Sequence, residues 1–433
     1  MSIETILPVD RQSVSAQSES KQEPQWMSEL RLKGLELAGA LELPKLEKTR
    51  LDRWSLDGYG GYKHTDLIKT YNELPEAAKE LLNEENSANL LVQINSNVAY
   101  SDVKAELAAQ GVLFLELASA LQQHGDLIKS YFMQAVKQDE SRISALHSAI
   151  WNGGIFIYVP KNVKVELPLQ ALFLSNDAQA TFAPHILIVA EANSSVSFVD
   201  NWISTEEGQR VANGVIEVFV KQGAKVRYAS VHSLSEQVTD LTYRRAVVEN
   251  DGRMEWIVGE LNSGNVLSDT TSILKGGGSS SDAKVICVGT NDQKMNLTTR
   301  AIHFGRSTNS DMITRAVMRD KSTAIINGVT KIEKGATGAN GQQTEKVLML
   351  SPHARGDANP ILLIDEDDVK CGHAASVGQV NPEQIHYLMS RGIAKSEAQR
   401  LIIYGFLAPV VAELPIEKLA AKLQELVERK LGQ

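Results

Sequence analysis

The residues best suited to chemistry gather in one short stretch near the C-terminal end of the chain. Carboxylates occupy all of positions 365–368, and Cys371 and His373 follow them. The thiol and the imidazole are two residues apart, so in an extended segment they point to the same side. A thiolate beside an imidazole is a borderline-soft ligand pair that suits iron or zinc, and Lys370 would help to keep the thiol ionised. Two ligands make an incomplete site, so a partner chain or a substrate must supply the rest.

A purely structural interpretation of the same stretch stays open. In that interpretation the acidic run is a solvated turn and His373 caps a helix. The other cysteine, Cys287, shares a strand face with Val285 and is predicted to be a buried apolar thiol. The sequence contains no P-loop, no nucleophile elbow and no His-Glu-x-x-His motif. With two cysteines in all, the chain cannot form an all-thiolate cluster or zinc site.

Composition excludes several classes of protein. The chain has 433 residues, 43% of them hydrophobic, which is enough for a large core. Its net charge of −9 is unsuited to coating nucleic acid or anionic membrane, and aromatics at 6% are too few for stacking platforms. Two cysteines fit a reducing compartment. Without a secretory signal or an apolar run of membrane-spanning length, the chain is expected to be a soluble cytoplasmic protein.

Four regions can be expected to position the candidate site. Residues 1–25 resemble a flexible arm, and residues 26–150 a mostly helical domain with a few short strands. Residues 151–350 carry short apolar runs of four to six residues between small polar turns. The turns at Ser195, Gly223 and Gly252 lie 28 to 29 residues apart, and a period of that size is typical of a solenoid.

The solenoid is predicted to be a parallel β-helix with two or three short strands in each coil, which makes the chain mainly β. An irregular β-sandwich is the structural alternative. Residues 351–433 are predicted to form a C-terminal helical domain, because Asn381-Pro382 is a helix start and Gly392 a helix stop. A last helix is expected to carry an apolar stripe. This stripe consists of Ile416, Leu419, Ala420, Leu423, Leu426 and Leu431.

Several motifs together resemble one known family. The stretch from Asp367 to Gly378, Asp-Asp-Val-Lys-Cys-x-His-x-Ala-x-Val-Gly, resembles the C-terminal signature of the SufB/SufD family of iron–sulfur cluster assembly proteins. Glu23-Pro24-Gln25-Trp26 resembles the start of the family's N-terminal helix. Residues 387–393 and 401–406 resemble its closing helices. The resemblance extends over roughly residues 23 to 430, and within the family the length and the two cysteines resemble SufD members rather than SufB members.

The resemblance implies a fold, partners and a role. It implies a right-handed parallel β-helix between helical ends, and a heterodimer with SufB through the β-helix edge. It implies a SufC ATPase on the C-terminal helical region, where Leu401, Tyr404 and Phe406 are the candidate contacts, so that ATP acts only through SufC. It also implies a transient iron–sulfur cluster shared with SufB, in which His373 faces a SufB cysteine and Cys371 lies beside it. The expected role is that of a scaffold without catalysis of its own.

Two other functions remain as alternatives. A SufB-like scaffold would hold its own cluster, although the shortage of cysteines argues against this. A β-helix enzyme that degrades polysaccharide would use the carboxylates of residues 365–368, but the aromatics that stack on sugar rings are sparse.

Overall fold

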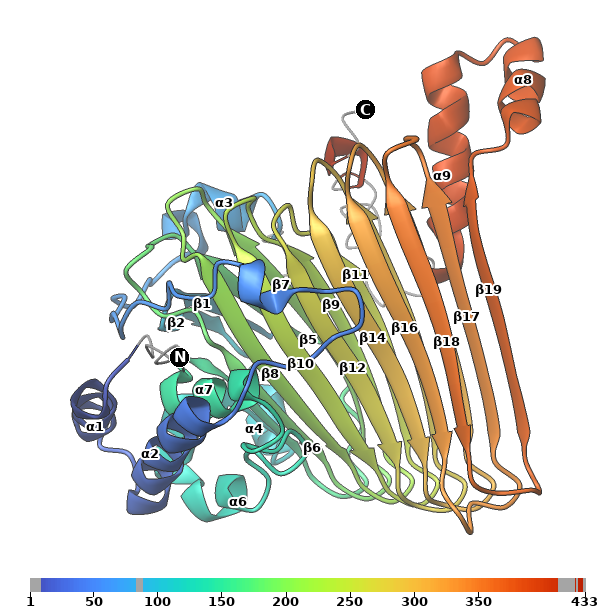
Figure 1. Ribbon diagram of the computed structural model, residues 1–433. Coiled ribbons are helices and arrows are strands. Elements are labelled where there is room, and N and C mark those ends of the chain that lie inside the picture. The colour runs from blue at the N-terminus through green and yellow to red at the C-terminus, as the bar shows by residue number, and fades with distance from the viewer. Residues whose placement is uncertain (1–8, 83–88, 412–424, 426, 431–433) are drawn as a thin grey trace.

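From residue 154 onward, strands that follow one another along the chain alternate between two sheets, and together these sheets form a parallel β-solenoid (Figure 1). A computed structural model describes residues 9–82, 89–411, 425 and 427–430. One sheet has 10 strands and the other has 9, and neighbours within each sheet are mostly alternate strands in the sequence. Each coil therefore contributes one strand to each sheet, and the predicted mainly-β parallel β-helix is confirmed.

The 10-stranded sheet contains, in chain order, β1 (Leu90–Ile94), β2 (Asn97–Asp102), β5 (Leu169–Ser175), β7 (Ser195–Ser204), β9 (Lys225–Ser233), β11 (Arg253–Glu260), β13 (Ser280–Gly289), β15 (Asn309–Met318), β17 (Asn340–Met349) and β19 (Lys370–Gln379). The 9-stranded sheet contains β3 (Leu113–Glu116), β4 (Gly154–Val159), β6 (His185–Ala190), β8 (Val211–Val220), β10 (Thr239–Val248), β12 (Val266–Leu274), β14 (Lys294–His303), β16 (Thr323–Ile332) and β18 (Arg355–Ile364). The α-helices are α1 (Arg11–Ser20), α2 (Gln25–Ala40), α3 (Glu76–Lys79), α4 (Ala105–Ala109), α5 (Leu117–Gln123), α6 (Gly125–Lys129), α7 (Arg142–Ile150), α8 (Pro382–Ser390) and α9 (Lys395–Val411).

The predicted repeat length follows from the way the coils stack. Lys225 pairs in register with Arg253, which pairs with Ser280, so the two steps are 253 − 225 = 28 and 280 − 253 = 27 residues. The turns between coils stack as closely as the strands. A Cβ atom at Gly223, whose φ is +65°, would lie 2.5 Å from Oδ1 of Asn193 in the preceding coil. Glycine suits this turn because it tolerates both the left-handed backbone and the close approach.

Two predictions about the strands were wrong. Many strands have 10 residues rather than four to six, because the polar residues beside each apolar run also pair with the neighbouring coil. The solenoid also does not end at residue 350, since β18 and β19 complete it and reach Gln379. Glycine, alanine and serine are frequent in β19, and these residues have little preference for strands. Pairing with β17 holds them extended, and this pairing is a tertiary effect.

The N-terminal region is more ordered and less separate than predicted. Part of the expected flexible arm forms α1, where the Asp10 side chain accepts a hydrogen bond from Ser13 N–H at 2.7 Å; residues 1–8 lie outside the described part. Within residues 26–150, β1 pairs in parallel with β5, and β3 pairs antiparallel with β4. The region predicted as a distinct helical domain therefore supplies strands to both solenoid sheets, as well as the helices that cover one end (Figure 1).

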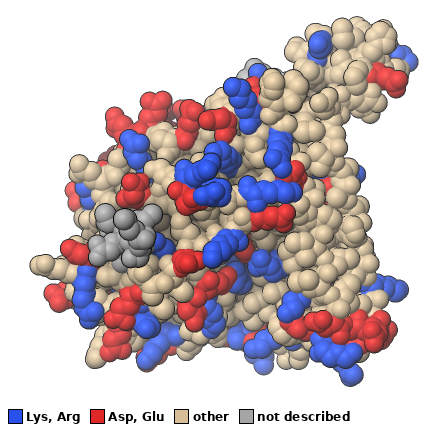
Figure 2. All heavy atoms as spheres, viewed as in Figure 1, with Lys and Arg blue, Asp and Glu red and all other residues tan. Residues whose placement is uncertain are grey.

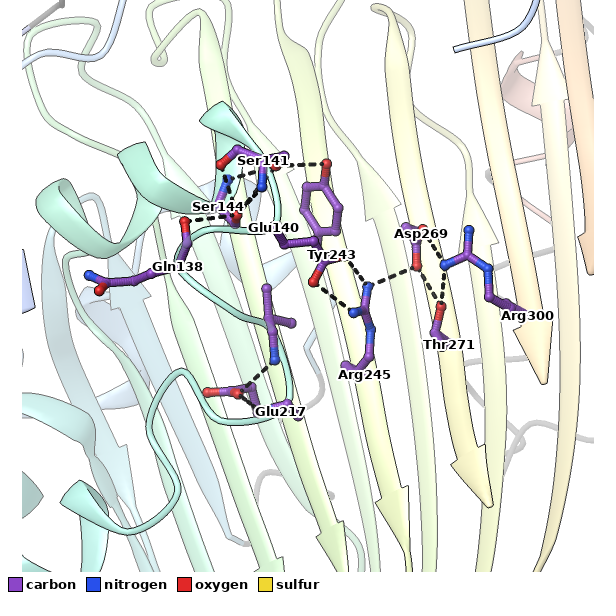
Figure 3. A network of polar contacts seen from close by, with 12 residues as sticks. Gln138, Glu140, Ser141, Ser144, Glu217, Tyr243, Arg245, Asp269, Thr271 and Arg300 are labelled. Atoms are coloured by element: carbon purple, nitrogen blue, oxygen red, sulfur yellow. Dashed lines mark hydrogen bonds and ion pairs between the residues drawn. The ribbon is translucent and has the colours of Figure 1, made fainter. Parts of the chain in front are cut away.

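A polar network fastens the loop before α7 to the outside of the solenoid (Figure 3). The buried carboxylate of Glu217 on β8 accepts hydrogen bonds from three backbone N–H groups of this loop, those of Met133, Ala135 and Val136, at 2.6 to 3.0 Å. The guanidinium of Arg245 on β10 donates two bonds of 2.8 Å to Glu140. These three backbone N–H groups of the loop thus depend on Glu217 for their hydrogen-bond partner.

Replacing Glu217 by glutamine is expected to weaken this attachment strongly. The amide that replaces one oxygen cannot accept a backbone hydrogen bond, so buried N–H groups lose their partner. Charge-assisted hydrogen bonds of this kind contribute about 1.5–3 kcal/mol each, so Glu217→Gln should lower the free energy of unfolding by about 2–4 kcal/mol. Urea unfolding followed by circular dichroism measures the change. Glu207→Gln, in an exposed turn, is the control. Equal losses in both variants would contradict the role given to Glu217.

The C-terminal helices begin and end where the sequence predicts. The Asn381 side chain accepts a hydrogen bond from Glu383 N–H at 2.8 Å, Pro382 occupies the first turn of α8, and Gly392 has a φ of +87°. Both helices project beyond the solenoid, and α9 packs against it through a buried apolar face (Figure 1). The predicted stripe from Ile416 to Leu431 lies outside the described residues. None of the described helices is both long and apolar enough to cross a membrane.

Candidate functional site

The final coil is open on one side. β18 ends the 9-stranded sheet and β19 ends the 10-stranded sheet, and in the described part of the chain no strand pairs with their outer edges. Both strands have 10 residues, so two rows of backbone donors and acceptors are available along this rim (Figure 1). An unpaired edge of this length is a ready template for pairing with a second chain.

The register of β19 shows which of its side chains face the inside of the solenoid. Cys371 pairs with Gly341 and His373 with Gln343 on β17. The Gln343 side chain reaches across the interior, where Thr330 on β16 donates a hydrogen bond to it at 3.0 Å. Cys371 and His373 therefore also belong to the inner row, on the same side of the strand as predicted. His373 is exposed because no coil lies over it, whereas Cys371 is half-buried.

The surroundings of Cys371 overturn the prediction that its thiol is kept ionised. Cys371 packs beside a small apolar cluster that contains Ile332 and Ala336, and this burial raises the pKa of the thiol. Lys370 is the adjacent residue of the strand, so its side chain points to the opposite face. The thiol therefore stays protonated near neutral pH and needs a metal or a base before it can act as a ligand. For Cys287, which is fully buried as predicted, burial raises the pKa to about 12.

Of the two structural interpretations of this stretch, the one for His373 is wrong and the one for the acidic run is confirmed. His373 does not cap a helix, because it lies within β19. The acidic run does form the turn between β18 and β19, where Glu366 accepts hydrogen bonds from the N–H groups of Gly335 and Asp367 at 2.9 and 3.0 Å. Asp365, Asp367 and Asp368 are exposed on this turn. At least one of the four carboxylates thus has a structural role.

Sequence analysis missed a fully buried polar cluster inside the solenoid. Ligand atoms of His232, Asp240 and Glu260 lie within 4.8 Å of one another. The guanidinium of Arg244 also lies among them, 2.9 Å from His232 Nε2 and 3.0 Å from Glu260 Oε1. Burial alone would raise the pKa of Asp240, but His232 and Arg244 lower it below its ordinary value. The arginine supplies the positive charge that these acids need, so the cluster is a stabilising ion network. The alternation of Asp240, Thr242 and Arg244 along one strand was the available signal.

Two models of known protein families match the sequence of this chain. The family model described as "SUF system FeS cluster assembly, SufBD core domain" matches residues 173–406, and the model for the "SufBD protein N-terminal region" matches residues 82–171. The chain belongs to the SufB/SufD family. The first match thus begins in β5 and ends in α9, and it includes the whole open rim.

Individual relatives narrow the placement within the SufB/SufD family. The chain is 45% identical over 438 residues to "Iron-sulfur cluster assembly protein SufD" of Bacillus subtilis, and all of both chains is covered. It is 30% identical to the "Iron-sulfur cluster assembly SufBD family protein" of Staphylococcus epidermidis and to its counterpart in Staphylococcus haemolyticus, with 95% of this chain and 90% of each relative covered. The predicted resemblance to SufD members is confirmed.

The three predicted partner-contact residues have different surroundings on α9. Leu401 is 43% exposed. Tyr404 is half-buried, and its hydroxyl donates to the carboxylate of Glu428. Phe406 packs toward the solenoid, with the Arg315 guanidinium 5.2 Å from its ring centroid. Of the three, Leu401 is the best placed to meet another protein, and its role as a contact stays a prediction.

Proposed function

We propose that this protein is a non-catalytic scaffold subunit of a SufB–SufC–SufD assembly, in which it forms one wall of a site where iron–sulfur clusters are built. The open rim of β18 and β19 would pair with SufB, and His373 would face a SufB cysteine. The nascent cluster is the cargo of this site, held transiently by both subunits. The observation that carries the proposal is an exposed imidazole in the inner row of an unpaired final coil.

Exposed apolar side chains support pairing at this rim. Leu363 and Ile364 at the end of β18 are 48% and 41% exposed, and Val377 on β19 is 44% exposed. Figure 2 shows that the face over β16 and β18 has few charged side chains, in contrast to the mixed charges over the rest of this view. Apolar area together with unpaired strand edges favours a second β-structured subunit as the partner.

The projecting helices α8 and α9 support a second contact, with the SufC ATPase. Tyr387 and Met389 on α8 are 57% and 44% exposed, and Leu401 on α9 is similarly open. ATP would act through this partner, because the sequence has no P-loop of its own. α9 packs against β13 and β15, so a force applied to the helices by SufC would reach the solenoid directly. The complex would work in the cytoplasm.

Hydrogen exchange in the assembled complex tests both contacts. Adding SufB is expected to slow amide exchange along β18 and β19, because their outer N–H groups would gain strand partners. Adding SufC should instead slow exchange in α8 and α9. β2, at the opposite end of the same sheet as β19, is the internal control and should not change. If SufB protects another surface and leaves β18 and β19 unaltered, the proposed interface is wrong.

A further inference from the structure

A second potential ligand lies just inside the open rim, on the strand next to His373. Glu345 and Gln343 on β17 are each only 1% exposed. One carboxylate oxygen of Glu345, Oε2, has no hydrogen-bond partner. Among the described residues, no cationic side chain forms an ion pair with Glu345. A buried carboxylate without a counter-ion or a full set of hydrogen bonds is unfavourable, so this arrangement favours binding of a cation.

The residues next to Glu345 are small, both on β16 and on the side toward the rim. Opposite it, on β16, a Cβ atom at Gly328 would lie 1.9 Å from Glu345 Oε1. Only glycine therefore allows the carboxylate to lie where it does. On the rim side Glu345 pairs with Ala375, whose side chain is a single methyl group and which is itself exposed. Only this last coil separates the carboxylate from the open end of the solenoid.

His373, on the neighbouring strand β19, is a residue whose side chain can bind iron. It pairs with Gln343, two residues from Glu345 on the same face, so His373 and Glu345 are diagonal neighbours. Diagonal pairs on one sheet face are separated by about 7–8 Å between backbones, a gap that two long side chains and one bridging ion can span. Gln343 lies directly below His373 in the register, and its amide oxygen also accepts the hydrogen bond of Thr330 at 3.0 Å. The register thus places all three residues on the inner face of the last two coils of this sheet.

We propose that Glu345 and His373, assisted by Gln343, form a loading site for ferrous iron at the mouth of the solenoid. An imidazole with carboxylate and amide oxygens is a ligand set that suits Fe²⁺. The ion needs no change of oxidation state to bind, and it takes the place of the proton that a buried carboxyl group without a counter-ion otherwise holds, which leaves to solvent. This inference rests on the proposed function, because it places iron beside His373 before a partner thiolate takes it up.

Anaerobic titration of the full-length chain with Fe²⁺, followed by equilibrium dialysis, tests the site. The unaltered chain is expected to bind one Fe²⁺. Glu345→Gln and His373→Ala should each weaken binding by at least about tenfold, since loss of a ligand costs no less than loss of a supporting residue. Glu333→Gln is the matched control. It removes one carboxylate from the turn after β16, where Glu333 lies 2.5 Å from Lys331, and should leave Fe²⁺ binding unchanged.

Several results would overturn the loading site: no saturable Fe²⁺ binding by the unaltered chain, or equal affinity in Glu345→Gln. If Glu345→Gln does not fold, Co²⁺ bound to His373→Ala decides the question, because His373 is exposed and its loss should not disturb folding. A visible Co²⁺ spectrum identical to that of the unaltered chain would then reject the site.

Cluster yield in the SufB–SufC–SufD complex separates the two proposals. Normal Fe²⁺ binding in Glu345→Gln with a lost yield in His373→Ala rejects only the loading site. Weakened binding in both variants with a normal yield rejects only the interface role of His373.

Discussion

Replacing His373 by alanine is expected to reduce iron–sulfur cluster yield in the assembled SufB–SufC–SufD complex by about tenfold or more. His373 carries an exposed imidazole in the inner row, whereas burial raises the pKa of the half-buried Cys371 thiol beside it. Loss of one metal-binding group costs at least as much as loss of a group that only supports it, about 10–100-fold in affinity. Cluster content is measured by visible absorption and by iron and sulfide analysis after anaerobic assembly.

The controls distinguish loss of a ligand from loss of the complex. His64→Ala removes another exposed imidazole, in the N-terminal region and 3.8 Å from Asp66, and should leave the yield unchanged. Size-exclusion chromatography shows whether the subunits stay together. His373→Cys replaces the imidazole with a thiolate ligand and should restore part of the yield. A normal yield in an intact His373→Ala complex would refute the ligand role.

Replacing Arg244 by leucine is expected to be the most destabilising single substitution in the solenoid. Its guanidinium is fully buried and bonds to His232, Glu260 and Ser268 at 2.8 to 3.0 Å. Asp240 lies in the same cluster and is also fully buried. Removing the one arginine would leave acids without their counter-charge in a place that water does not reach. Breaking a buried ion network in this way costs about 3–5 kcal/mol.

Urea unfolding compares Arg244→Leu with Arg253→Leu. Arg253 also has two acidic partners, Glu255 at 2.7 Å and Asp282 at 2.8 Å, but its side chain is 48% exposed on the outer face. Solvent screens that pair, so its loss should cost less than about 1 kcal/mol. Similar losses of stability in the two variants would show that burial does not govern the strength of the inner network.

That Cys371 and His373 share one face could be predicted from the sequence because this geometry is local. Cys371 and His373 are two residues apart, and any strand places such residues on one face. Glu345 could not be predicted in the same way. It lies 373 − 345 = 28 residues before His373, and its position relative to His373 depends on the register between β17 and β19. A shift of one residue in the pairing of β19 would turn His373 to the outer face, away from Glu345.

The end of the solenoid shows the same difference. The acidic run at residues 365–368 and the small residues of β19 have little preference for strands. The helix start at Asn381-Pro382 then led to the prediction of a helical domain over residues 351–433. The pairing of β18 with β16 and of β19 with β17 overrides that local preference. Because this extra coil belongs to the solenoid, His373 lies on a rim that a partner can reach.

The sequence by itself determined the repeat, the parallel β-helix, the two capping signals of α8 and the Cys-x-His pair. Each depends on residues close together along the chain, where backbone geometry relates spacing directly to direction. The tertiary structure alone decided which carboxylate lies in the coil below His373, which arginine neutralises the inner acids and where the last coil ends. These features join residues from different coils, and only the register of the stacked strands brings such residues together.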